Sequence, residues 1–111
     1  MTIIDTAPFG RADPSAPTTI QLVGDIDFLT GPALREALLS ALLHSRSLLI
    51  LDLSGVTFCD ARGLSVLAGV QNRARSMGIT LALTAPSRNM SRLLRITGMD
   101  HSMPMVRPSA G

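Results

Sequence analysis

The sequence predicts a single α/β domain with a mostly parallel sheet of four or five strands and about three helices. Three segments predict the strands: residues 19–23 are β-prone, and residues 48–53 and 79–84 are short apolar runs. Each is followed by a stretch whose apolar residues recur at helical spacing. Successive strands are separated by about two dozen residues, which is enough for helical crossovers between parallel strands.

The domain is expected over residues 18–106, preceded by an arm (1–17) and followed by a tail (107–111). Residues 6–17 contain three prolines and a glycine, a composition typical of a loop. The short apolar run 2–4 before them is a candidate edge strand. A chain of 111 residues fits one such domain.

The first strand and the first helix have local boundary signals. Gly24 and Asp25 are expected to end the strand that begins near residue 19. Thr30 is expected to cap the helix by accepting from the free amides of its first turn. Pro32 lies in that turn, where its missing N–H costs no intrahelical hydrogen bond. The apolar stripe of this helix consists of Leu34, Leu38, Ala41 and Leu42.

The central strand, residues 48–53, is apolar on both faces, as a central parallel strand must be. Residues 54–59 are expected to be a connector. Asp60 is a candidate N-cap for a helix that runs to about Met77, and Gly78 is expected to end it. Gly69 inside this helix costs about 1 kcal/mol of helix propensity, which predicts a close approach to the sheet.

The C-terminal part is expected to contain a third helix and a last strand. The helix opens at Pro86 and Ser87 and ends at Gly98. Residues 103–106 are a candidate edge strand. The inner side of the helix is expected to consist of Met90, Leu93, Leu94 and Thr97.

The composition excludes several classes of function. A single cysteine, Cys59, allows no internal disulfide and no multi-cysteine metal site. It is expected to be a small buried hydrophobe, although the nearby helix start could lower its pKa. The formal net charge is only +2, and the ten arginines are scattered, so direct nucleic-acid binding is not expected. No signal peptide and no run of ~18 apolar residues is present, so membrane insertion is not expected.

Catalysis is not expected either. His44 and His101 are isolated, and the chain has no Gly-x-Ser-x-Gly, Gly-x-Gly-x-x-Gly or Walker motif. Asp25, Asp52 and Asp60 could gather around a magnesium ion at the strand ends, but no phosphate-binding loop accompanies them. We therefore expect neither an enzyme nor a cofactor.

Three segments resemble the STAS domain of anti-sigma-factor antagonists. Residues 49–64, LILDLSGVTFCDARGL, resemble the family's buried strand, short loop and Asp-Ser-x-Gly-Leu helix start. Residues 24–27 resemble the Gly-x-Leu-Asp turn before its first helix, and residues 87–100 resemble its third helix and Gly-Leu/Met ending. The resemblance covers about residues 18–106 and implies a STAS-like sandwich.

The resemblance also implies a bacterial, cytoplasmic regulator of transcription. Family members sequester an anti-sigma factor, whose kinase domain inactivates them by phosphorylating the serine after the aspartate. Ala61 occupies that position, so the switch is not expected there, and Arg62 makes the spot cationic. Hydroxyls at Ser54, Thr57 and Ser65 are candidate substitute phosphorylation sites, with turn or helix-surface roles as the alternative.

The expected docking surface is the start of the second helix, whose unpaired amides and positive dipole end face outward. The expected partner is a kinase-type anti-sigma factor. The alternative is a structural STAS subunit, such as the accessory subunit of a lipid-transport ABC transporter, which binds an ATPase and never cycles through phosphorylation. The expected partner-binding residues are Asp25, Asp27, Asp60, Ala61, Arg62 and Gly63.

Family members commonly carry a fourth helix after the last strand. Residues 103–111 include Pro104 and Pro108, so such a helix is not expected here. Apolar surface left uncovered in its absence would favour self-association, for example as a homodimer.

Overall fold

The computed structural model describes residues 2–5 and 18–107. The loop expected within 6–17 and the end of the tail, 108–111, lie outside the described residues, as does residue 1. The predicted α/β fold is confirmed: one five-stranded sheet has the order β1-β2-β3-β4-β5. Its strands are β1 (Thr2–Asp5), β2 (Thr18–Ile26), β3 (Leu48–Cys59), β4 (Thr80–Thr84) and β5 (Met105–Val106).

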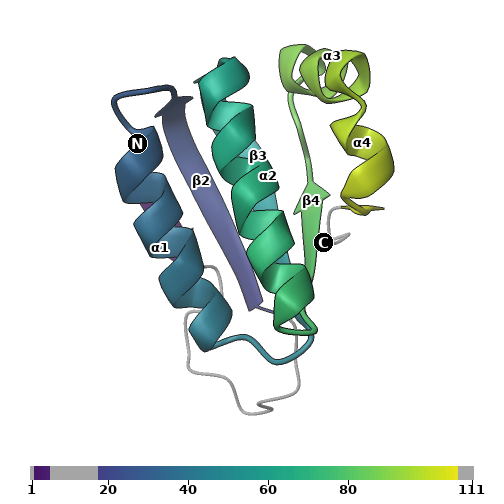
Figure 1. Ribbon diagram of the computed structural model, residues 1–111. Helices are drawn as coiled ribbons and strands as arrows, with labels where there is room; N and C mark the ends of the chain where they lie inside the picture. The colour runs from purple at the N-terminus through teal and green to yellow at the C-terminus, as the bar shows by residue number, and fades with distance from the viewer. Residues whose placement is uncertain (1, 6–17, 108–111) are drawn as a thin grey trace.

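The four strands β2 to β5 run parallel, and β1 pairs antiparallel with β2 at the edge. Two long helices lie side by side over one face of the sheet, and two shorter ones lie beside β4 (Figure 1). The helices are α1 (Gly31–Leu43), α2 (Ala61–Ser76), α3 (Arg88–Thr97) and α4 (Met99–Ser102).

The core lies between this sheet face and the helices. Residues of β3 alternate along the strand, so that Leu49, Leu51 and Leu53 face the helices and are fully buried. Their neighbours are the buried residues of β2 and the apolar stripes of α1 and α2, including Leu22, Leu34, Leu38, Leu42, Leu64 and Leu67. This packing fixes where the helix ends stand relative to the strand ends.

Two strands are longer than the sequence predicts. Gly24 and Asp25 do not end β2, and residues 54–59 are not a connector but the second half of β3. The β2–β3 register shifts between Gln21 and Val23 and again between Gly24 and Asp25. Gly24 has φ of +103°, a value that favours glycine. Residues typical of turns therefore lie here at irregular positions within strands. The local sequence pattern is the same for such a position and for a turn, so it could not tell them apart.

Of the two N-caps expected from the sequence, the one at Asp60 is confirmed and the one at Thr30 is wrong, while Ser87, where the third helix was expected to open, also caps its helix. Asp60 accepts from the amide of Gly63 at 2.8 Å, and Ser87 accepts from that of Met90 at 3.1 Å. Thr30 precedes α1 but makes no side-chain cap, because its hydroxyl is bonded within the preceding turn. Thr97 was expected on the inner side of α3 but is exposed.

Candidate partner-binding site

The α2 tip, residues 60–63, is the point on which the predicted surface centres. Asp60 has an extended backbone, and its carboxylate caps the helix through the amide of Gly63. Its own amide donates to the carbonyl of Ile26 at 3.3 Å, which ties the tip to the end of β2. Ala61 and Arg62, the first two helical residues, are exposed. The tip is therefore held rigidly and faces solvent.

Gly63 explains why the tip can lie so close to β2. A Cβ added there would stand 2.5 Å from the Ile26 carbonyl oxygen and 3.0 Å from the Cys59 sulfur, so no larger residue fits without movement. Gly63 therefore allows the start of α2 to pack closely against the end of β2. The approach expected at Gly69 is wrong, because a Cβ there would meet nothing within 4 Å.

A second segment, the β2–α1 turn (residues 27–30), is folded around Asp27. Its carboxylate accepts from the amides of Leu29 at 2.9 Å and Thr30 at 3.1 Å. The Thr30 amide has the largest effect and holds the pKa of Asp27 below its usual value of 3.8. Loss of hydration opposes it with the next largest effect, and the Leu29 amide then lowers the pKa further. The Thr30 hydroxyl accepts from the Asp27 amide and donates to the Asp25 carbonyl. Asp27 therefore shapes the turn.

Asp25 joins this turn to the end of β3. The Thr57 hydroxyl donates to the Asp25 carboxylate at 2.7 Å, across the pairing of β2 with β3. Because Thr57 lies three residues before Asp60, the bond connects the turn with the approach to the α2 tip. The structure thus brings the predicted residues of both segments to one end of the sheet.

Three exposed apolar side chains flank the α2 tip and were not identified from the sequence. Phe28 is 57% exposed, Leu29 74% and Phe58 53%. The Arg62 guanidinium carbon lies 5.4 Å from the centre of the Phe28 ring, so this arginine contacts the turn across the surface. A usable sequence signal was the presence of large apolar residues in segments that were expected to be turns or connectors.

The candidate phosphorylation sites are dispersed. Thr57 is exposed and bonded to Asp25, and the Ser65 hydroxyl donates to the Ala61 carbonyl at 3.0 Å, one helical turn along α2. Ser54 accepts from Gln21 at 3.2 Å. Six residues of extended strand, about 20 Å, separate it from Asp60. Only Thr57 and Ser65 are therefore close to the tip.

Cys59 does not have a lowered pKa. Burial, with a smaller contribution from the Asp60 carboxylate, raises the pKa of its thiol to about 11. The expectation that the helix start could lower it is wrong, because both the loss of hydration on burial and the adjacent Asp60 carboxylate disfavour the thiolate. At neutral pH the side chain is a protonated thiol, which is a poor nucleophile.

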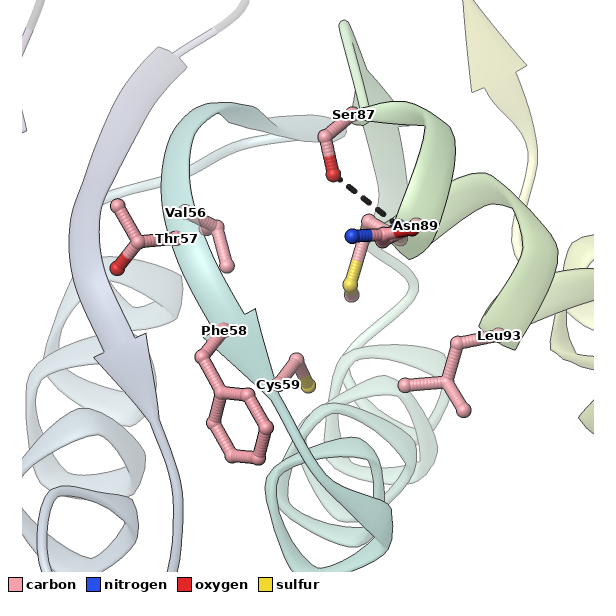
Figure 2. A pocket seen from close by; sticks show the side chains of 8 residues that line it. Val56, Thr57, Phe58, Cys59, Ser87, Asn89 and Leu93 are labelled. Carbon is pink, nitrogen blue, oxygen red and sulfur yellow. Dashed lines mark hydrogen bonds between the residues drawn. The ribbon is translucent and has the colours of Figure 1, made fainter.

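A pocket of about 270 Å³ opens beside the tip. Figure 2 shows Val56, Phe58 and Cys59 of β3 on one side and Leu93 of α3 on the other. Ser87, Asn89, Thr57 and Met90 complete its lining. The pocket is predominantly apolar.

Within residues 2–5 and 18–107, no three His, Cys, Asp or Glu side chains stand close enough to hold a metal ion. Asp25 is bonded to Thr57, while Asp52 accepts from the amide of Ser54, so these carboxylates do not gather with Asp60. None of the helices in the described ranges is long and apolar enough to cross a membrane.

Comparison with known proteins identifies the fold's family. A family model described as "Mlab, STAS domain" matches residues 9–107. The chain belongs to the STAS domain family. This STAS domain is 34% identical over 81 residues to the anti-sigma-B factor antagonist of Listeria monocytogenes, covering 73% of this chain and 71% of the relative. It is 30% identical over 92 residues to that of Bacillus subtilis, covering 83% and 84%.

A solved structure agrees with this assignment. The crystal structure of an anti-sigma factor antagonist from Mycobacterium paratuberculosis superimposes with a TM-score of 0.69 at 27% identity, covering 97% of this chain and 87% of that one. These three relatives are named as anti-sigma factor antagonists, while proteins named as sulfate and anion transporters share the fold at lower identity.

Proposed function

We propose that this STAS domain is an anti-sigma-factor antagonist that docks on a kinase-type anti-sigma factor through the α2 tip. The relatives that support the proposal are named as anti-sigma factor antagonists. The observation that carries it is the capped and exposed helix start, held against β2 by Gly63 and flanked by exposed Phe28 and Phe58. Aromatic side chains around a rigid polar centre are typical of protein interfaces.

The second part of the proposal is that docking is not switched off at residue 61. Ala61 has no hydroxyl, and Arg62 beside it carries a permanent positive charge. The candidates nearest to it for a displaced switch are Thr57 and Ser65. A phosphate on Thr57 would replace its bond to Asp25 with repulsion between like charges, and one on Ser65 would stand one turn above Ala61.

Titration calorimetry against a purified kinase-type anti-sigma factor of the same organism tests the docking surface. Ala61→Glu should weaken binding by about tenfold or more, since a charge buried without a partner in an interface costs at least ~1.4 kcal/mol. The matched control is Asn72→Glu, a similar charge on an exposed position of the same helix. Unchanged affinity of the Ala61 variant, or no binding by the wild type, would contradict the proposal.

A phosphorylation assay tests the switch. Incubation with ATP and the anti-sigma factor should leave residue 61 unmodified, and mass spectrometry would locate phosphate on Ser54, Thr57 or Ser65 if the switch lies elsewhere. A pull-down that recovers a transporter ATPase and no anti-sigma factor would instead favour the structural STAS subunit.

A further inference from the structure

The second half of β3 has an open edge. β3 pairs with β4 only from Leu48 to Asp52, because β4 ends at Thr84 and the chain turns away at Ala85, which has φ of +53°. Beyond that point, residues 53–59 pair with β2 alone. Within the described ranges, no backbone hydrogen bond joins residues 53–59 to α3. The Ser54 amide donates to the Asp52 carboxylate. Among the described residues, no neighbouring strand pairs with the rest of the edge that faces α3, so its backbone donors and acceptors are available to one.

The 270 Å³ pocket lies along this edge, with the strand as one wall and α3 as the other (Figure 2). We call this feature the β3–α3 groove. Its strand wall carries Phe58, and its helix wall carries the half-buried Leu93. The volume is below the ~300–1,000 Å³ typical of small-molecule sites. It matches a single aliphatic side chain of a peptide better than a free cofactor.

The exposed side of α3, next to the residues that line the groove, is cationic. Arg88, Arg92 and Ile96 are spaced by four residues and form the row of α3 next to Asn89 and Leu93. Both arginines are exposed, neither has an ion pair within residues 2–5 and 18–107, and Ile96 is 68% exposed. No acidic residue occurs in α3. An occupant with acidic side chains would be complementary to this side of α3.

We propose that the β3–α3 groove binds an extended acidic segment of the protein partner, which adds as a strand to residues 53–59 of β3. One aliphatic side chain of the segment fills the pocket against Leu93, and acidic side chains face Arg88 and Arg92. Main-chain bonds to a free strand edge supply affinity, and the pocket supplies specificity. The partner's identity rests on the proposed function, and the groove continues directly from the α2 tip through Phe58 and Cys59.

An extended occupant is favoured over a helix by the free edge. A helix satisfies its own backbone groups and would leave those of residues 53–59 unpaired, whereas a strand pairs with them. The distinction can be measured, because amides in a strand point alternately toward and away from the neighbouring strand.

The probe is a blocked eight-residue peptide that alternates valine and glutamate, titrated into the ¹⁵N-labelled full chain. Saturable amide shifts are expected at residues 53–59 and 88–96. N-methylation of one alternate set of peptide amides should abolish binding, and methylation of the other set should not. The counterpart with lysine in place of glutamate should not bind.

Two variants and a matched control complete the test. The double variant Arg88→Gln with Arg92→Gln should bind the peptide about 3- to 10-fold more weakly, the range expected for losing two exposed charge pairs. Arg46→Gln with Arg73→Gln removes the same charge from exposed positions at the other end of the sheet and should have no effect. Leu93→Asp should abolish binding, with its fold checked by circular dichroism.

The absence of saturable shifts at millimolar peptide would overturn the inference, as would equal binding of the lysine peptide or equal effects of both methylation patterns. The assay contains no anti-sigma factor, so its failure leaves the proposed docking through the α2 tip untouched. Conversely, an anti-sigma factor that does not bind the chain would refute the proposed function and leave peptide binding in the groove standing.

Discussion

Replacing Gly63 by alanine should destabilise the domain because the new methyl group collides with main-chain atoms. The Cβ would stand 2.5 Å from the Ile26 oxygen and 2.7 Å from the Ile26 side chain. Reaching the ~3.3 Å of a close C···O contact requires a movement of about 0.8 Å. Overpacking of this kind costs about 1–3 kcal/mol, and alanine's better helix propensity returns up to about 1 kcal/mol. We expect a net loss of about 1–2 kcal/mol.

Gly69→Ala is the matched control in the same helix. Nothing stands within 4 Å of its added Cβ, so this variant should gain about 0.5–1 kcal/mol from helix propensity alone. The two variants should differ by about 1.5–3 kcal/mol in unfolding free energy, or roughly 6–15 °C in melting temperature. Since the chain has no Trp or Tyr, urea unfolding is best followed by far-UV circular dichroism. A Gly63→Ala variant as stable as the wild type would refute the reasoning.

Three further outcomes follow from the same region. Asp60→Ala should cost about 1 kcal/mol of unfolding free energy, while Asp60→Asn, which also caps, should cost much less in the same urea assay. Because the pKa of Cys59 is raised from 9.0 to about 11, its alkylation by iodoacetamide at pH 8 should be about 100-fold slower than that of a free thiol. The same shift makes stability fall between pH 9 and 11, and Cys59→Ser should remove that decline. The lowered pKa of Asp27 stabilises the fold above pH 3.8, and this stabilisation is lost on acidification below that pH. In a pH titration, the free energy of unfolding of Asp27→Asn should therefore decrease less on acidification than that of the wild type.

The sequence predicted most of the fold because its signals are local. The apolar run before Asp60 and the caps at Asp60 and Ser87 depend on residues within one or two turns of each other. Alternation and helical spacing likewise need no knowledge of the tertiary structure. The extension of β3 through residues 54–59 was missed because it depends on pairing with β2, more than thirty residues away.

The candidate site was predicted only in part. The residues of the α2 tip follow from one motif, but their distance from the β2–α1 turn depends on long-range bonds such as Thr57 to Asp25. The exposure of Phe28 and Phe58 cannot be read from hydrophobicity, which predicts burial instead. The raised pKa of Cys59 likewise required its burial to be known, because the helix start alone predicts the opposite sign.

The geometry of the α2 tip is compatible with the proposed docking in the absence of a hydroxyl at residue 61. The contacts that hold the tip in place are the Asp60 cap, the Asp60 amide bond to Ile26 and the packing of Gly63, and none of them involves the side chain of residue 61. A serine at this position would therefore add a site of modification without adding support for the tip. Its replacement by Ala61 removes the site and leaves the presented surface intact. The groove beside Cys59 is equally independent of residue 61, since its walls come from β3 and α3. If the chain docks through the α2 tip as proposed, docking and switching depend on different atoms of the same helix start, and docking does not require a hydroxyl at residue 61.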